Sequence, residues 1–173
     1  MKNNCWLPCL EEFNDYGDWG RYEAVLYEIF KNDFITTKPC FENKPVNIRK
    51  HPMEGNKEQA FFHVTSQDYF KDCERVPDMR RCERIRWIRS FIEKYNCDPT
   101  KCVECQGLKV WEEDKQPKWN GNRVHLLLEE ERFMVVLERR GTFFLLVTAF
   151  YLERDHTLRK KIQQYINSTS KIK

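Results

Sequence analysis

The last third of the chain consists of four apolar segments of strand length joined by short polar connections. These segments, which are rich in Val, Leu and Phe, cover residues 108–111, 123–128, 133–137 and 142–152. Apolar runs of this length, bounded by polar or glycine-containing turns, are typical of β-strands. The connections at residues 129–131 and 138–141 are too short for a crossover, so neighbouring strands should pair antiparallel. The sequence therefore predicts an antiparallel sheet of about four strands.

Helical patterns flank this predicted sheet. Apolar residues recur at helical spacing over residues 19–34. Asp78 can cap a second helix that extends to about Tyr95. Asp155 can cap a closing helix that extends to about Ile166. Helices, then a meander of strands, then one helix predict an α+β domain whose N-terminal helices cover one face of the sheet.

The stretch between the first two predicted helices is less regular. Residues 36–55 contain three prolines, and residues 46–49 have the composition of a short strand. Residues 60–64 form a short apolar run, and residues 65–68 resemble a helix cap. The sequence thus predicts one short strand and one helix start in this stretch.

Composition indicates a folded domain. Of the 173 residues, 40% are hydrophobic, and 5 Trp, 7 Tyr and 12 Phe are too many aromatic side chains for a disordered protein. A chain of this length buries about 70% of its unfolded surface, so a stable core needs no disulfide bonds. We predict a single domain over residues 1–173, with three appended features: an N-terminal extension (residues 1–18), a cysteine-rich loop (96–106) and a basic tail (167–173).

No segment of the sequence suits a membrane. The longest apolar run, residues 143–152, is interrupted by Thr148 and is far shorter than the roughly 20 residues of a membrane helix. No apolar stretch of signal-peptide length follows Lys2. We therefore expect a cytoplasmic protein that does not bind a membrane. Because cytoplasmic thiols stay reduced, the 8 cysteines do not indicate a disulfide framework.

One group of cysteines has the spacing of a metal site. Cys102 and Cys105 are separated by two residues, as zinc ligands often are, and Cys97 lies five residues earlier. The sequence predicts a structural zinc held by these three thiolates, with three reduced, unliganded thiols as the alternative. A structural zinc takes four ligands. The fourth would come from Cys73, Cys82 or His125.

Positive charge is concentrated in two segments, although the net charge is only +3. Six arginines lie between Arg75 and Arg89, and six basic residues lie between Arg154 and Lys173. The planar guanidinium group suits bidentate contact with phosphate, and a basic tail adds salt-sensitive affinity for nucleic acid. The arginine-rich helix is explained equally well as a solvated helix face, because Arg is a good helix former.

Three motifs in the order of the chain resemble a known family. They are the segment Phe-Phe-His-Val-Thr-Ser at residues 61–66, the arginine-rich helix at residues 80–88, and the strand pair at residues 133–137 and 145–151, which ends in Thr-Ala-Phe-Tyr. Together they resemble the phage-type members of the barnase/EndoU/colicin/RelE-like nuclease superfamily over about residues 22–165. The resemblance implies N-terminal helices on a curved antiparallel sheet, and a metal-independent ribonuclease, often a toxin with an antitoxin or immunity partner.

The resemblance also implies roles for individual residues. Cleavage of RNA without metal needs a base, an acid and donors for the charge that builds on phosphate. His63 would be the acid or base, since imidazole titrates near neutrality, and Arg84 would contact the phosphate. Thr148 and Tyr151 would position the scissile group. The residues expected to bind RNA are Arg80, Arg81, Arg86 and Arg139.

Each of these assignments has a structural alternative. His63 lies in an apolar run and could be a core histidine, and the Thr148 hydroxyl could be satisfied inside the core. Tyr151 suits ordinary strand packing. The rival function is a non-catalytic phage accessory protein that uses the arginine-rich helix to hold RNA or a protein. No cofactor is expected to take part in catalysis.

Overall fold

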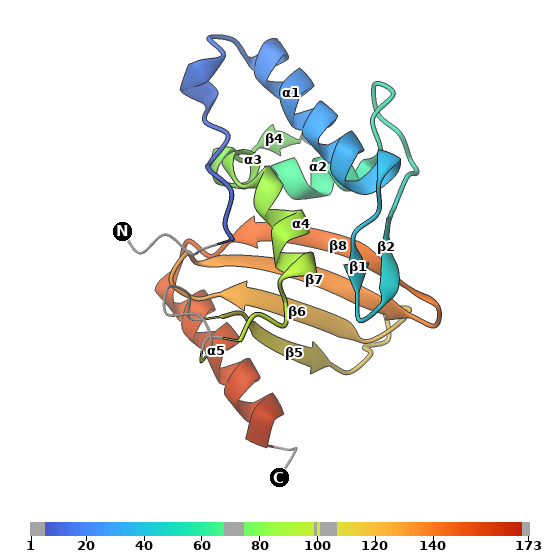
Figure 1. Ribbon diagram of the computed structural model, residues 1–173, viewed down its shortest axis with the longest axis vertical. Coiled ribbons are helices and arrows are strands. Elements are labelled where there is room, and N and C mark those ends of the chain that lie inside the picture. The colour runs from blue at the N-terminus through green and yellow to red at the C-terminus, as the bar shows by residue number, and fades with distance from the viewer. Residues whose placement is uncertain (1–5, 68–74, 99, 101–106, 171–173) are drawn as a thin grey trace.

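The strands form a curled, mixed sheet that has the shape of a half-barrel, with helices on both faces (Figure 1). The computed structural model describes residues 6–67, 75–98, 100 and 107–170. The six-stranded sheet has the order β1-β2-β8-β7-β6-β5. Its strands are β1 (Cys40–Phe41), β2 (Lys44–Ile48), β5 (Lys109–Glu113), β6 (Arg123–Leu128), β7 (Phe133–Arg140) and β8 (Phe143–Tyr151). A separate pair is formed by β3 (Ser66–Gln67) and β4 (Val76–Pro77).

Helices α1 to α4 pack on one face of the sheet, and α5 packs on the other (Figure 1). The helices on the first face are α1 (Trp19–Lys31), α2 (Gln59–Thr65), α3 (Met79–Glu83) and α4 (Ile85–Glu93). Two short turns of helix lie nearby, η1 (Phe13–Asp15) and η2 (Asn32–Thr36). The opposite helix is α5 (Asp155–Ser170). The α+β class, the N-terminal helices and the C-terminal helix are confirmed.

The prediction of an antiparallel sheet of about four strands is wrong in two respects. β1 and β2 come from the N-terminal half and raise the number of strands to six. β2 also pairs with β8 in parallel, with Val46 opposite Phe144 and Ile48 opposite Leu146. A pairing between segments about one hundred residues apart cannot be predicted from the local sequence, because periodicity indicates only which face of a strand is apolar.

Two further predictions are corrected in detail. Residues 60–64 belong to helix α2, which Ser66 caps at its C-terminus, and the Thr65 hydroxyl donates back to the Phe61 carbonyl oxygen at 2.8 Å. Asp68, the last residue of the predicted cap, lies outside the described residues. The helix expected from Asp78 to Tyr95 exists as α3 and α4, separated at Arg84. The Asp78 cap is confirmed, since its carboxylate accepts from the backbone N–H groups of Arg80 and Arg81.

Strand register decides which side chains face α5. The larger core contains alternate residues of the central strands, among them Val135 and Leu137, and is covered by α1 to α4. Their neighbours Met134 and Val136 face α5. A register shift lies between Val136 and Leu137, and Thr148 stands opposite Val136. This arrangement brings polar side chains of β6, β7 and β8 to the α5 side.

The edge of β8 is covered in two different ways. β2 pairs only with residues 144–146, so the edge beyond Leu146 lacks a neighbouring strand. Helices α2 and α3 contact this second part of β8 instead. The Thr148 hydroxyl, which lies there, donates to the His63 carbonyl oxygen at the end of α2. An edge strand needs such cover to avoid pairing with another chain.

The start of α5 is held by Arg132, which lies in the connection between β6 and β7. Its Nε donates to the Leu152 carbonyl oxygen at 2.8 Å, and its Nη2 donates to Asp155 Oδ1 at 2.7 Å. The Leu152 N–H donates to the Arg132 carbonyl oxygen in return. Among the described residues, no helix is both long and apolar enough to cross a membrane.

Gly121, in the loop before β6, offers a test of this packing. A Cβ at this position would lie 2.0 Å from the Arg139 carbonyl oxygen of β7. Because this oxygen belongs to the backbone of a strand, relieving the clash requires a displacement of the strand. Gly121→Ala should lower the free energy of unfolding by about 1–3 kcal/mol, measured by urea denaturation. Gly141→Ala is the control, because a Cβ there meets no atom within 4 Å. Equal loss of stability in the two variants would contradict the predicted clash.

Candidate functional site

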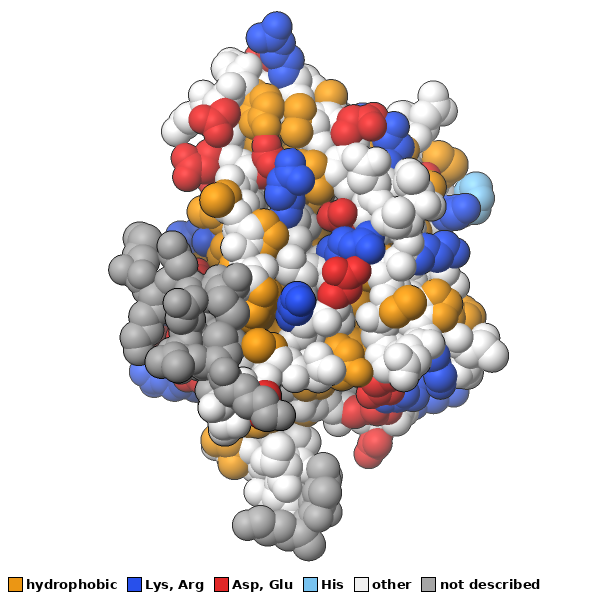
Figure 2. All heavy atoms as spheres, viewed as in Figure 1, with side chains coloured by type: hydrophobic (Ala, Val, Ile, Leu, Met, Phe, Trp, Pro, Cys, Tyr) orange, Lys and Arg blue, Asp and Glu red, His pale blue; other side chains and the backbone are white. Residues whose placement is uncertain are grey.

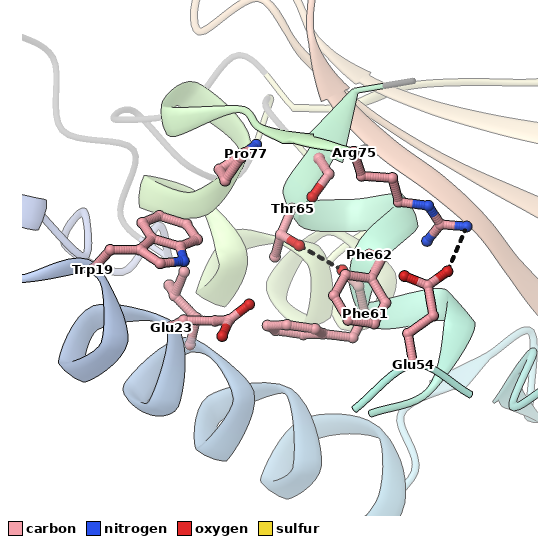
Figure 3. Close-up of a pocket in the computed structure, with 10 residues that line it drawn as sticks. Trp19, Glu23, Glu54, Phe61, Phe62, Thr65, Arg75 and Pro77 are labelled. Atoms are coloured by element: carbon pink, nitrogen blue, oxygen red, sulfur yellow. Dashed lines mark hydrogen bonds and ion pairs between the residues drawn. The ribbon is translucent and has the colours of Figure 1, made fainter. Parts of the chain in front are cut away.

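A pocket of about 580 Å³ lies between α1 and α2 (Figure 3). Trp19 and Phe62 line it, and the Arg75 guanidinium forms an ion pair with Glu54 at 3.5 Å. Glu23 adds a second carboxylate to the lining. None of the residues predicted to be catalytic lines this pocket. An excess of carboxylate also makes it a poor site for a polyanion.

Two other pockets share lining residues and are lined mainly by basic side chains among their charged groups. The first, of about 170 Å³, is lined by His63, Arg49, Glu138, Arg123 and Thr148, among others, and we call it the His63 pocket. The second, of about 480 Å³, lies between the sheet and α5, and we call it the α5 groove. Arg123 and Thr148 line both, so the two pockets adjoin. In each, basic side chains outnumber carboxylates.

His63 enters the first pocket from the last turn of α2. Its carbonyl oxygen accepts a hydrogen bond from Arg81 Nη1 at 2.9 Å and one from Thr148 Oγ1 at 3.2 Å. These bonds tie α2 to both α3 and β8. The structure therefore brings together three of the predicted residues, and both His63 and Thr148 line the pocket.

Glu138 is a buried carboxylate that the sequence analysis did not select. It is only 3% exposed and lies between two guanidinium groups. Arg123 Nε is 3.4 Å from Glu138 Oε2, and Arg140 Nη2 is 2.6 Å from Glu138 Oε1. Glu138 stands opposite Arg123 in the β6–β7 ladder, so both side chains face α5. A carboxylate and an imidazole thus line one pocket with two arginines, Arg49 and Arg123.

Arg84, Arg80 and Tyr151 form a separate cluster on the helix side of β8. The Arg84 guanidinium lies 5.0 Å from the Trp87 ring centroid and 5.1 Å from that of Tyr151. Arg80 lies over the same tyrosine at 4.5 Å. The Arg84 side chain is only 13% exposed. These contacts hold α3 against the end of β8 through stacking of guanidinium on aromatic rings.

The remaining arginines expected to bind RNA point to other elements. Arg86 Nε donates to Glu11 Oε2 at 2.8 Å, in the N-terminal segment. Arg139 pairs with Glu112 and Glu42, and these bonds raise its pKa and lower the pKa of Glu112. The arginines of 75–89 therefore share no single surface. On the face that Figure 2 shows, acidic and basic side chains are interspersed.

The zinc prediction falls mainly outside the described residues. Cys102, Cys105 and Cys73 lie there, whereas Cys97 and the two other candidates for the fourth ligand, Cys82 and His125, are described. Within the described residues, no group of three His, Cys, Asp or Glu side chains is placed to hold a metal. Cys82 is fully buried, donates to the Thr65 carbonyl oxygen, and has its pKa raised to about 12 by burial.

His125 forms the floor of the α5 groove. Its ring stacks on Trp111 with centroids 4.8 Å apart, and its Nε2 lies 3.1 Å from Glu113 Oε2. Burial lowers the pKa of His125 to about 3, and the nearby Lys161 and Arg123 add to this effect. The ring is therefore neutral at pH 7 and donates a hydrogen bond to Glu113.

The depressed pKa of His125 predicts how stability depends on pH. Below its ordinary value of 6.5, the unfolded chain binds a proton at His125 that the folded protein excludes until about pH 3. The free energy of unfolding should therefore decrease as the pH is lowered through this range. This residue contributes at most about 1.4 kcal/mol per pH unit to the decrease. His125→Phe keeps the stack on Trp111 and removes the titration. Denaturation curves measured from pH 7 to pH 4 should show that the variant loses less unfolding free energy than the native chain. Equal losses of unfolding free energy in the two proteins would contradict the assignment.

Comparisons with known protein families, curated proteins and solved structures found no match for this chain. The resemblance to the nuclease superfamily is therefore carried by the sequence motifs alone. The chemistry of the site follows from the groups that line it, which are an imidazole, a carboxylate, a hydroxyl and guanidinium groups beside a cationic groove.

Proposed function

We propose that this protein is a metal-independent ribonuclease that cleaves RNA by attack of the ribose 2′-OH on the adjacent phosphate. The observation that carries the proposal is the lining of the His63 pocket, which combines His63 and Glu138 with Arg49, Arg123 and Thr148. Two groups able to transfer a proton, beside guanidinium groups that can neutralise phosphate, are what this reaction requires. The motif resemblance supports the same activity.

In this proposal, each group that lines the pocket has a role. The Glu138 carboxylate takes the proton of the 2′-OH, whose oxygen then bonds to phosphorus. The bond from phosphorus to the 5′-oxygen breaks, and His63 donates its proton to that leaving oxygen. The products are a 2′,3′-cyclic phosphate and a free 5′-hydroxyl. Arg123 and Arg49 offset the charge that builds on the phosphate, and the Thr148 hydroxyl keeps His63 in place through its carbonyl.

The arginine-rich helix has a supporting role in this proposal. Arg81 bonds to the His63 carbonyl, and the stack of Arg80 and Arg84 on Tyr151 holds α3 against β8. These residues therefore position the catalytic histidine. The rival function, a non-catalytic binder that uses this helix, gains no support because the arginines point to different partners. In a cell, the proposed activity would be toxic unless an antitoxin or immunity protein blocked the pocket.

The proposal is tested by incubating the protein with a defined RNA in the presence of a chelator of divalent metals. The native chain should cleave it and leave 2′,3′-cyclic phosphate ends. His63→Ala and Glu138→Gln should each lower the rate by about 10²–10⁴-fold, the usual contribution of acid–base catalysis. The release of new RNA ends over time is the measurement.

His51→Ala is the matched control for this experiment. His51 is exposed and lines neither the His63 pocket nor the α5 groove, so its removal should leave the rate unchanged. Circular dichroism should show that all three variants are folded. No cleavage by the native chain, or equal cleavage by native protein and His63→Ala, would reject the proposal.

A further inference from the structure

The α5 groove adjoins the proposed catalytic pocket along the face of the sheet. Arg123 and Thr148 line both spaces, so a chain lying in the His63 pocket can continue toward α5 without leaving the protein. The groove, at about 480 Å³, is much larger than the His63 pocket, which has about 170 Å³. A scissile phosphate in the smaller pocket therefore leaves room next to it for a neighbouring nucleotide.

Aromatic rings form part of the groove wall. Trp119 and Phe150 both line it, together with the apolar side chains of Met134 and Val136. The Arg123 guanidinium stacks on the Trp119 ring, with Cζ 4.4 Å from the ring centroid. Aromatic and guanidinium planes are the surfaces on which unpaired bases stack in single-strand binding sites.

Two lysines of α5, Lys160 and Lys161, place positive charge in the groove. Among the described residues, no carboxylate oxygen lies within 4 Å of the ammonium group of Lys160 or Lys161, whereas Lys109 pairs with Glu129 at 2.7 Å. Glu113, the carboxylate among the described lining residues, bonds to the neutral His125 and so keeps its negative charge. Burial lowers the pKa of Lys161, and the charge of Glu113 raises it. The two ammonium groups outnumber this carboxylate, so the groove favours a bound anion.

We propose that the α5 groove binds a single-stranded nucleotide next to the scissile phosphate, with its phosphate between Lys160 and Lys161 and its base against Trp119. This inference rests on the proposed ribonuclease function for the identity of its ligand. It adds a substrate class, since a base that stacks in the groove must be unpaired. It also gives α5 a function, because this helix supplies both lysines.

The test measures binding separately from cleavage. A short 2′-O-methyl oligonucleotide keeps the phosphates and bases of RNA but lacks the attacking hydroxyl, so it binds without being cut. Its affinity for the native chain and for a Lys160→Ala/Lys161→Ala double variant is measured by fluorescence anisotropy at several salt concentrations. We expect the double variant to bind at least about tenfold more weakly, with a salt slope lowered by ~0.7 for each phosphate that the variant no longer neutralises.

Arg154→Ala/Arg159→Ala is the matched control. It removes the same charge from the region of α5, but neither arginine lines the groove. This control should weaken binding less than threefold. Trp119→Ala should weaken binding by about tenfold, because the base no longer stacks, and should leave the salt slope unchanged. Equal loss of affinity in the two double variants would overturn the inference, since binding would then follow net charge alone.

The outcomes also separate this inference from the proposed function. If the lysine variant binds weakly while no RNA is cut by the native chain, the groove is a nucleotide site and the catalytic proposal fails. If the native chain cuts RNA and the lysine variant binds as well as the arginine control, catalysis stands and the groove inference fails. His51→Ala should bind the oligonucleotide normally in either case, because His51 lines neither the His63 pocket nor the α5 groove.

Discussion

Two hydrogen bonds to the carbonyl oxygen of His63 join the three elements on which the candidate site depends. Arg81 brings α3 to this oxygen, and Thr148 brings β8. The carbonyl is available because α2 ends two residues later, at Thr65, and the last carbonyls of a helix have no partner within it. The part of β8 left without a neighbouring strand is closed by these same contacts. The His63 carbonyl oxygen, which has no partner within its helix, thus accepts two hydrogen bonds that hold α2 and α3 against the edge of β8. The same bonds fix the backbone position of the histidine.

The sequence predicted the parts of the fold that depend on local pattern. Strands β5 to β8 and helix α5 lie where apolar runs and short connections placed them, and Asp78 caps its helix as expected. The parallel pairing of β2 with β8 could not be predicted, because it joins segments distant in the chain. The run at residues 60–64 was ambiguous for another reason. A mainly apolar run of five residues suits either a strand or a helix, and only packing decides between them.

The site was predicted in part for the same reasons. His63 and Thr148 line one pocket, whereas Arg84 and Tyr151 lie on the other side of β8. Glu138 and Arg123 were missed because they lie near the ends of their strands, where charged residues usually belong to turns. Their burial follows from register, since Arg123 and Glu138 stand opposite each other in the β6–β7 ladder, on the face toward α5. Register is a property of paired strands, so a single sequence does not reveal it.

Arg132 has a consequence for how this protein can vary. Surface connections between strands usually tolerate insertions and deletions. The connection before β7 is an exception, because Arg132 bonds to the Leu152 carbonyl and to Asp155 and so sets the direction in which α5 leaves the sheet. A residue added or removed there would shift Arg132 and so change the direction of α5, which would move Lys160 and Lys161. In relatives of this chain, the length of that hairpin and the identity of the α5 residues are expected to change together.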